Sequence, residues 1–284
     1  MAEVKEKTAP KAKVTKVTAT PKEVSKYRRF IEKVGAAWSK KKHQSKFWKV
    51  FLTIVELLAF TGWVLLALQI SQWILLGAVT LLREVFGVEI QYSASLQTVL
   101  SAIVYVIDLF ITIGVPALLF GGKADRNSLG LRGLFTWTDI GMGVIGFILS
   151  MIGALIIGAL ASAIFPWIDM EEAQEVGFDN ISGFKDMLMA FLALVVIAPV
   201  AEEIVFRGWL YGKLRRRTWA IPAIMLTSVA FGVAHGQWNV GITVAVMSLF
   251  MCLIREMTGT IYGGMIVHML KNGLAFYLLF VYGM

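Results

Sequence analysis

Charged residues and cysteine are both scarce in this sequence. Only 16% of its 284 residues are Asp, Glu, Lys or Arg, whereas 57% are hydrophobic. A soluble domain carries about a quarter charged residues, so the composition excludes an ordinary soluble protein. The lone cysteine, Cys252, excludes an intrachain disulfide and says little about compartment. We interpret the chain as an all-α, polytopic membrane protein.

The charge that is present lies mostly near the N-terminus. Residues 1–50 contain 15 Lys or Arg and 4 Asp or Glu, a net charge of +11. Since the whole chain carries +8, the remaining 234 residues carry −3. Segment 1–46 is Lys- and Thr-rich and lacks signal-peptide features, so we expect a disordered basic cytoplasmic tail. Its positive charge either anchors anionic lipid or only sets the topology. No nucleic-acid partner is expected.

Seven apolar segments are each of about the length that crosses the hydrocarbon core of a bilayer. They are residues 51–82, 96–120, 139–165, 184–212, 219–237, 240–255 and 259–282. The predicted fold is a bundle of about seven transmembrane helices. Basic loops stay in the cytoplasm, so we expect the N-terminus inside. The absence of an internal repeat weakens the case for a transporter built from inverted halves.

The fourth apolar segment contains the stretch "APVAEEIVFRGWLYGKL", in which charged residues lie where hydrocarbon is expected. Each such residue costs about 2.5–3.5 kcal/mol on insertion scales, which makes it a functional candidate. Glu203 and Arg207 are four apart on one helix face and can neutralise each other. Glu202 points elsewhere without a local cation, so it can accept a proton from water. Pro199 is expected to kink the helix beside it.

Histidine is also rare, and only two of the three lie in apolar segments. His235 has Phe231 four residues before it, and His268 has Asn272 four residues after it. One buried histidine alone is usually a satisfied structural residue. Two histidines, a glutamate pair and an asparagine, however, must all find polar partners in hydrocarbon. We therefore predict that these side chains converge in one polar cavity.

Such a cavity supports a narrow range of chemistry. The sequence offers no nucleophilic serine pairing, no HExxH and no GxGD-like aspartate pair. A carboxylate and an imidazole can activate a water as a general base, and a second imidazole and an amide can donate to an oxyanion. This combination fits amide hydrolysis without a covalent intermediate.

Three stretches, "EEIVFRG", "FGVAH" and "HMLKN", resemble the EExxxR, FxxxH and HxxxN motifs of the CPBP family, in spacing and in order. That family comprises type II CAAX prenyl endopeptidases and bacteriocin-processing or immunity (Abi) proteins. The resemblance covers roughly residues 184–276. On this basis we expect accessory transmembrane spans in residues 47–183 and a catalytic core in residues 184–284.

The resemblance also implies roles for the motif residues. Glu202 and His235 would activate the hydrolytic water, and His268 and Asn272 would form the oxyanion site. Supporting roles fall to Glu203, Arg207 and Phe231. Enzymes of the family are often labelled metalloproteases, and zinc, if bound, would be held by Glu202, His235 and His268. We favour water activation without a metal and expect no cofactor.

The expected function is that of an intramembrane endopeptidase. Its substrate would be a membrane-associated peptide, such as a prenylated tail, a leader or a pheromone-type propeptide. One alternative is a non-catalytic immunity or sensor-regulating binding protein of the same family. A transporter or channel is another, and would need a polar pathway to both membrane faces. Two further charges, Glu56 and Asp108, are interpreted as structural, and "KLRRR" as a cytoplasmic cap.

Overall fold

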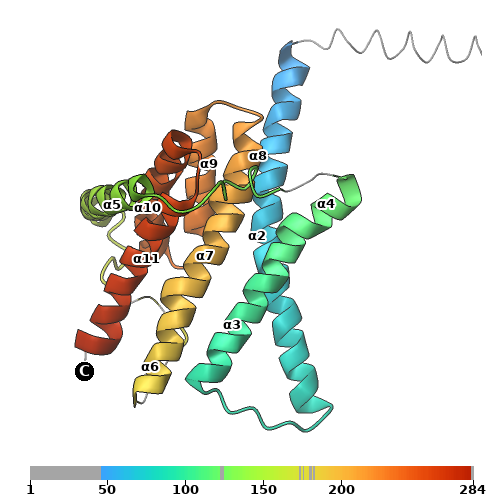
Figure 1. Cartoon of the computed structure of the whole chain (residues 1–284), viewed down its shortest axis with the longest axis vertical. Helices are drawn as coiled ribbons and strands as arrows, with labels where there is room; N and C mark the ends of the chain where they lie inside the picture. Colours follow the sequence, from blue (N-terminus) through green and yellow to red (C-terminus); the bar gives the residue numbers. More distant parts are fainter. Residues whose placement is uncertain are drawn as a thin grey trace, which may run out of the picture. The chain divides into compact units, whose positions relative to one another are not determined.

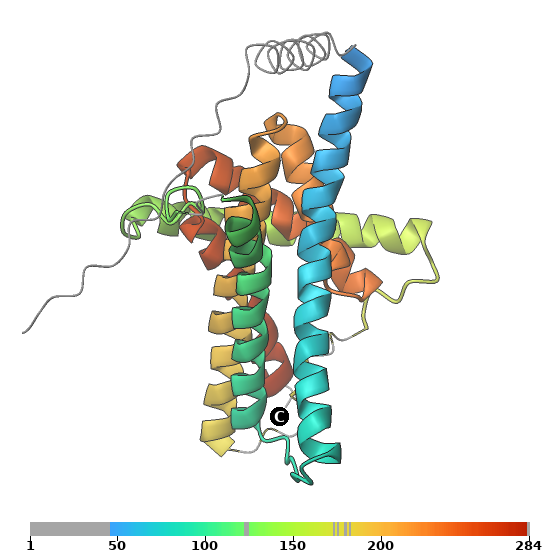
Figure 2. The same cartoon turned by 90° about the vertical axis from the view of Figure 1, so that its right-hand side faces the viewer.

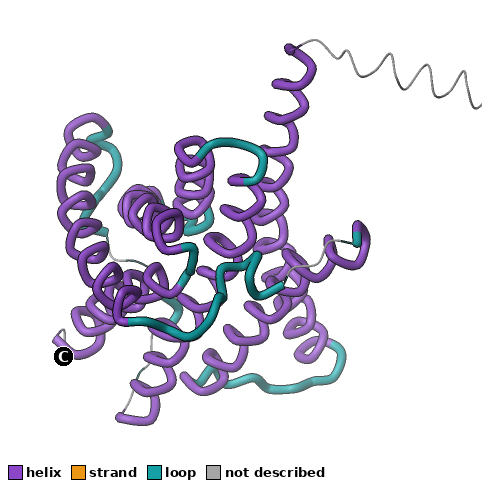
Figure 3. The backbone as a smooth tube through the Cα atoms, turned by 45° about the horizontal axis from the view of Figure 1, so that its top comes forward, coloured by secondary structure: helices purple, strands orange, loops and turns teal. Residues whose placement is uncertain are grey.

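The computed structural model describes residues 46–121, 125–172, 174, 176–178, 181 and 183–282. Nearly all of the predicted tail, residues 1–45, lies outside them. The chain forms two units, Met1–Leu52 and Thr53–Met284. The packing and the sites discussed below belong to the second unit. Every regular element of the described residues is a helix (Figures 1 and 3).

Six helical stretches among the described residues are long and apolar enough to cross a membrane. They are α2 (Lys46–Glu84), α3–η1–α4 (Ala94–Leu109, Phe110–Gly114, Val115–Phe120), α5 (Trp137–Ile164), α6–η2–α7–η3–α8 (Gly183–Phe191, Leu192–Ile197, Ala198–Glu203, Ile204–Leu210, Tyr211–Arg215), α10 (Trp238–Thr258) and α11–η4 (Tyr262–Tyr277, Leu278–Tyr282). The chain is therefore a multi-pass integral membrane protein, and the all-helical fold is confirmed. The fifth predicted segment, 219–237, forms only the 14-residue helix α9 (Ala220–Val233).

Helix α5 begins at a capping box and packs closely on two later helices. The Thr136 hydroxyl accepts from the Asp139 backbone N–H at 3.2 Å, and Asp139 Oδ2 accepts from the Thr136 N–H at 2.9 Å. The Thr260 hydroxyl donates to Asp139 Oδ1 at 2.6 Å, tying this cap to the turn between α10 and α11. A Cβ on Gly143 would lie 2.6 Å from Ile266 Cβ, so the close approach of α5 to α11 requires a glycine there.

Wider π-helical turns flank the segment that carries the two glutamates. At the end of η2 the Ala198 N–H donates to the Ala193 carbonyl, five residues back. In that register the next donor would be residue 199, but Pro199 has no N–H. The Leu194 carbonyl is therefore left without a backbone donor and is available to a side chain. Pro199 thus interrupts the regular helical bonding beside Glu202.

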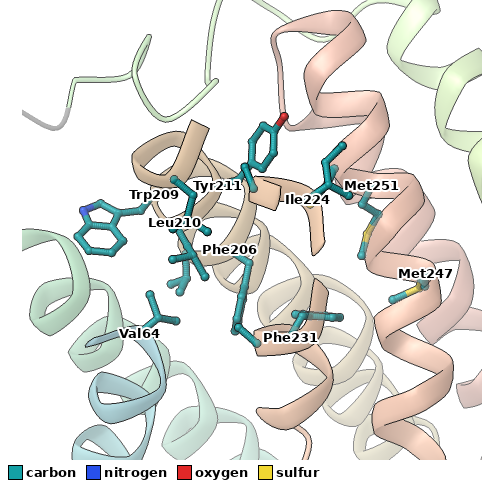
Figure 4. Close-up of a cluster of buried hydrophobic side chains, with 14 of the residues drawn as sticks. Val64, Phe206, Trp209, Leu210, Tyr211, Ile224, Phe231, Met247 and Met251 are labelled. Atoms are coloured by element: carbon teal, nitrogen blue, oxygen red, sulfur yellow. The ribbon is translucent and has the colours of Figure 1, made fainter. Parts of the chain in front are cut away.

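The long helix α6–α8 lies beside α3 in both views of the ribbon (Figures 1 and 2). Helix α9 packs on α10, and α10 and α11 both pack on α5. A buried apolar cluster fills the space where η3, α9 and α10 meet; Figure 4 shows Phe206, Leu210, Phe231, Met247 and Met251. This packing places residues of η3, α9 and α10 around the polar groups described next.

Candidate active site

Glu203 and Arg207 form the ion pair that their spacing predicts. Arg207 Nη1 lies 2.7 Å from Glu203 Oε1, and both side chains are completely buried. The guanidinium carbon of Arg207 also lies 4.2 Å from the centroid of the Phe231 ring, which adds a cation–π contact. A Cβ on Gly264 would lie 2.7 Å from Glu203 Oε2, so α11 approaches the carboxylate through a residue without a side chain.

Glu202 has different surroundings although it is the neighbouring residue. The Tyr105 hydroxyl in α3 donates to Glu202 Oε1 at 2.7 Å. Glu202 Oε2 is buried, has no hydrogen-bond partner among the described residues and lies 3.7 Å from His268 Nε2. One oxygen of the carboxylate is thus held in place while the other stays available for a ligand or a water.

His268 lies between the two glutamates. Its Nδ1 is 3.3 Å from Glu203 Oε1, and its Nε2 faces Glu202 Oε2. The ring packs edge-on against Phe231, with centroids 5.6 Å apart and planes at 85°. His268 therefore connects the buried Glu203–Arg207 pair with the more accessible Glu202.

His235 follows α9 directly and is oriented by its own helix. His235 Nδ1 lies 2.8 Å from the Phe231 carbonyl oxygen. A carbonyl can only accept, so Nδ1 carries a proton, and in the neutral form of the ring the lone pair lies on Nε2. The ring also packs on Phe231 with centroids 4.8 Å apart. Phe231 thus contacts both histidines and Arg207, which agrees with a supporting position.

Asn272 uses the carbonyl that Pro199 leaves free. Its Nδ2 donates to the Leu194 oxygen at 2.9 Å, which joins α11 to η2. A carboxamide nitrogen has two hydrogens, so one donor orients the side chain and the other can serve a ligand. The missing N–H of Pro199 therefore accounts both for the irregular helix near it and for the position of the Asn272 side chain.

The structure brings the four predicted catalytic residues together on one cavity of about 700 Å³. Glu202, His235, His268 and Asn272 all line it. Glu203, Arg207 and Phe231 lie behind this lining and contact it through His268 and His235. The convergence expected from the cost of polar groups in hydrocarbon is present in the fold.

Two further lining residues were missed from the sequence, namely Tyr105 and Lys271. Tyr105 is 97 residues from its partner Glu202, and no local pattern links two such distant positions. Lys271 is partly buried within a membrane helix, so the insertion cost applied to the glutamates would have singled it out. It forms no hydrogen bond or ion pair with the residues described, yet lies close enough to Glu202 and His268 for their charges to interact.

The two charges interpreted as structural have local partners. Glu56 Oε2 lies 3.2 Å from Arg217 Nε, and both side chains are substantially exposed. Asp108 Oδ1 accepts from the Thr112 hydroxyl one helical turn later at 3.1 Å. Asp108 is buried and lies outside the cavity lining. Neither residue lines the cavity, although Asp108 lies close enough to Glu202 and Tyr105 for their charges to interact.

The zinc alternative was tested against the arrangement of possible ligands. Within the described ranges, no three His, Cys, Asp or Glu side chains form a group that could hold a metal ion. The side chains of Glu202, His235 and His268 form no such group in this arrangement, and no step below passes through a metal.

Comparison with known proteins identifies the segment that carries this site. Residues 184–274 match the family described as type II CAAX prenyl endopeptidase Rce1-like. The match begins in α6, ends in α11 and contains all three motifs, so the resemblance seen in the sequence is confirmed over this Rce1-like segment. Tyr105 lies outside it.

One curated relative extends the comparison. The chain is 23% identical over 154 residues to a Bacillus subtilis (strain 168) protein named "Putative membrane peptidase YdiL". The aligned part is 53% of this chain and 57% of the relative, so the chain spans little more than half of that protein's length. No solved structure matches the chain.

Proposed function

We propose that the chain is a membrane-embedded endopeptidase that hydrolyses a peptide bond in a membrane-associated substrate. One observation carries the proposal: a carboxylate, two imidazoles and a carboxamide from α7, the turn after α9, and α11 line one cavity, and one carboxylate oxygen has no partner among the described residues. The printed names of the matching family and of the relative, an endopeptidase and a membrane peptidase, support it.

The first step of the reaction is the activation of water. We assign the water to Glu202 Oε2 and His235 Nε2, two acceptors on residues that line the same cavity. Tyr105 holds the other carboxylate oxygen, so Oε2 keeps its direction toward the cavity. Transfer of a proton from the water to Glu202 generates the hydroxide that attacks the carbonyl carbon of the scissile bond.

The second step is the stabilisation of the charge that develops on the carbonyl oxygen. The free N–H of Asn272 faces the cavity and is the donor we assign to this oxyanion. His268 adds a second donor, Nε2–H, only when both of its ring nitrogens carry a proton, because Nδ1 faces the Glu203 carboxylate. The proton taken up by Glu202 then passes to the leaving nitrogen as the C–N bond breaks. The Glu203–Arg207 pair holds His268 from behind and touches no reacting atom.

Lys271, a cation in the lining of the cavity, indicates a feature of the substrate. An unpaired ammonium at membrane depth is unfavourable unless it meets an anion. We assign Lys271 to the C-terminal carboxylate of the peptide, which would place the scissile bond near the substrate's end. A CAAX-type prenylated tail, a leader or a pheromone-type propeptide could present it from the cytoplasmic side, with the N-terminus of the chain inside.

The test compares cells that express the wild type, Glu202→Gln and Glu89→Gln at matched levels. Glutamine keeps the shape of Glu202 and can still accept from Tyr105, but it cannot act as a base. Glu89 is an exposed carboxylate outside the cavity and serves as the control. Membrane-associated and secreted peptides are profiled by mass spectrometry.

We expect one precursor to accumulate and its product to disappear with Glu202→Gln, whereas Glu89→Gln matches the wild type. An unchanged peptide profile, together with a wild-type phenotype in the Glu202→Gln cells, would overturn the protease assignment. That result would favour the non-catalytic alternative, an immunity or sensor-regulating binding protein, in which the same polar groups form a structural core.

A further inference from the structure

A second cavity, of about 580 Å³, lies between α2, η1–α4, the loop at residues 128–129 and η3–α8. We call it the basic hollow. It shares no lining residue with the candidate active site. Its lining combines aromatic and basic side chains: Phe60, Trp63, Phe120, Trp209, Lys213, Arg216 and Arg217. None of its described lining residues is acidic. Arg217 is paired with Glu56, which does not line the hollow, so Lys213 and Arg216 are the lining cations for which no carboxylate partner is described.

The basic residues of the hollow come from the stretch "KLRRR". From the sequence alone, all four of its cations are expected to lie together at the cytoplasmic membrane surface. Arg215 instead turns away and pairs with Glu256, with Nη2 and Oε1 2.9 Å apart. Lys213, Arg216 and Arg217 all line the hollow. Three cations of this motif therefore converge on one cavity, which a simple topology signal does not require.

The aromatic side chains of the hollow pack around Lys213. The Lys213 ammonium lies 5.6 Å from the centroid of the Trp209 ring and 6.0 Å from that of Phe60. These two rings meet edge to face at 6.0 Å. Pro116 cannot donate to the Thr112 carbonyl, and Trp63 Nε1 donates to it instead at 3.2 Å. Specific contacts within the protein thus hold these aromatic side chains in place without a ligand.

The part of the hollow lined by α4 is apolar and exposed. Phe120, at the end of α4, is 83% exposed, and Leu119 is 70% exposed. A membrane-spanning helix presents such residues to lipid chains. The hollow therefore combines basic side chains with exposed apolar ones, which matches an amphiphile with a negatively charged head.

We propose that the basic hollow binds an anionic diacyl phospholipid. The phosphate lies among Lys213, Arg216 and Arg217, and one acyl chain lies along Phe60, Trp63 and Ala117. Arginine forms paired hydrogen bonds with phosphate oxygens, and lysine adds a point charge. Bound lipid would contact η3, the segment that carries Arg207 on its other side, without entering the active-site cavity.

The test measures lipid binding to the purified full chain in a non-ionic detergent by native mass spectrometry. Phosphatidylglycerol and phosphatidylcholine with identical acyl chains are titrated separately. The variant Lys213→Gln with Arg216→Gln removes two cations of the hollow. The control, Arg126→Gln with Arg132→Gln, removes two cations from the neighbouring loop that do not line it. Ala117→Phe fills the apolar part of the hollow without changing the charge.

We expect the wild type to bind the first phosphatidylglycerol more tightly than phosphatidylcholine. Lys213→Gln with Arg216→Gln should weaken phosphatidylglycerol binding by roughly tenfold or more, since each cation near an anionic lipid contributes about 1 kcal/mol. The control pair should change it little. Ala117→Phe should weaken binding of both lipids and leaves the proposal testable if the double variant does not fold.

Three results would overturn the proposal. Equal affinity of the wild type for the two lipids would remove the head-group preference. A control pair that weakens binding as much as the Lys213 and Arg216 changes would point to diffuse charge attraction. Competition by millimolar inorganic phosphate with no effect of Ala117→Phe would show that the site takes a free anion and not a lipid. Peptidase activity enters none of these readouts.

Discussion

The accessory helices and the Rce1-like segment are both apolar, but they bury their residues very differently. In the most apolar windows of α2, α3–α4 and α5, 17% of residues are buried. The corresponding share is 44% for α6–α8 and for α10, and 28% for α11. The first set presents most of its surface to lipid, whereas the second set encloses a polar interior. Mean apolarity therefore does not distinguish a lipid-facing helix from one that builds a site.

Tyr105 is an exception to this difference between the accessory helices and the Rce1-like segment. It belongs to a lipid-facing accessory helix, yet its hydroxyl contacts the carboxylate that we propose as the catalytic base. The Rce1-like segment alone, residues 184–274, does not contain this contact. The accessory helices are then part of the site and not only a membrane anchor. The predictions below test how far the two regions are distinct.

The largest effect should come from the buried interior. Arg207→Met removes the cation of a fully buried pair and leaves Glu203 without a charged partner. Breaking such a pair costs about 3–5 kcal/mol of stability, to be measured by unfolding in mixed detergent micelles. Arg217→Met breaks the exposed pair between the Rce1-like segment and Glu56 of the accessory helix α2, and should cost about 1 kcal/mol or less. Equal losses would remove the contrast between the regions.

The next largest effect should come from the contact between the accessory helices and the Rce1-like segment. Tyr105→Phe removes one hydrogen bond to a charged carboxylate, worth about 1.5–3 kcal/mol, and should lower kcat by roughly 10- to 100-fold. KM should stay nearly constant because Tyr105 orients Glu202 and does not bind substrate. Tyr92→Phe, at an exposed position, is the control. An unchanged kcat for Tyr105→Phe would confine the site to the Rce1-like segment.

A smaller effect should depend on the substrate. Lys271→Met should slow cleavage of a prenylated peptide with a free C-terminal carboxylate by roughly tenfold, because a hydrogen-bonded charge pair is lost. The same peptide with a C-terminal carboxamide should be cleaved equally by both proteins. Lys271→Arg should restore much of the difference. Equal losses on both peptides would instead place Lys271 at the oxyanion.

The smallest effect should follow metal removal. Preincubation of the purified protein with 1,10-phenanthroline should leave the cleavage rate unchanged, since we propose Glu202 and His235 as the activating groups. Inactivation that zinc reverses would show that a metal is needed, and would revive the ligand set Glu202, His235 and His268. This measurement separates the glutamate mechanism from the zinc mechanism within the same cavity.

Much of the site could be predicted because its parts are local. The spacing of Glu203 and Arg207 on one helix turn is enough to pair them, and the pair is present. The His235 and His268 motifs could be identified from order and spacing. We expected seven full spans, but the segment at α9 forms a helix of only 14 residues. Apolarity indicates that a helix is present, but it does not fix the residue at which the helix ends.

The sequence by itself determined the membrane class, the helical segments, the Glu203–Arg207 pair and the motif residues, because these depend on composition and on spacing within one helix. Only the tertiary structure decided that Tyr105 meets Glu202, that His268 lies between two carboxylates and that Asn272 meets Leu194. It also decided that three of the four "KLRRR" cations share one hollow. Such contacts join helices distant along the chain, and their partners are set by how those helices pack.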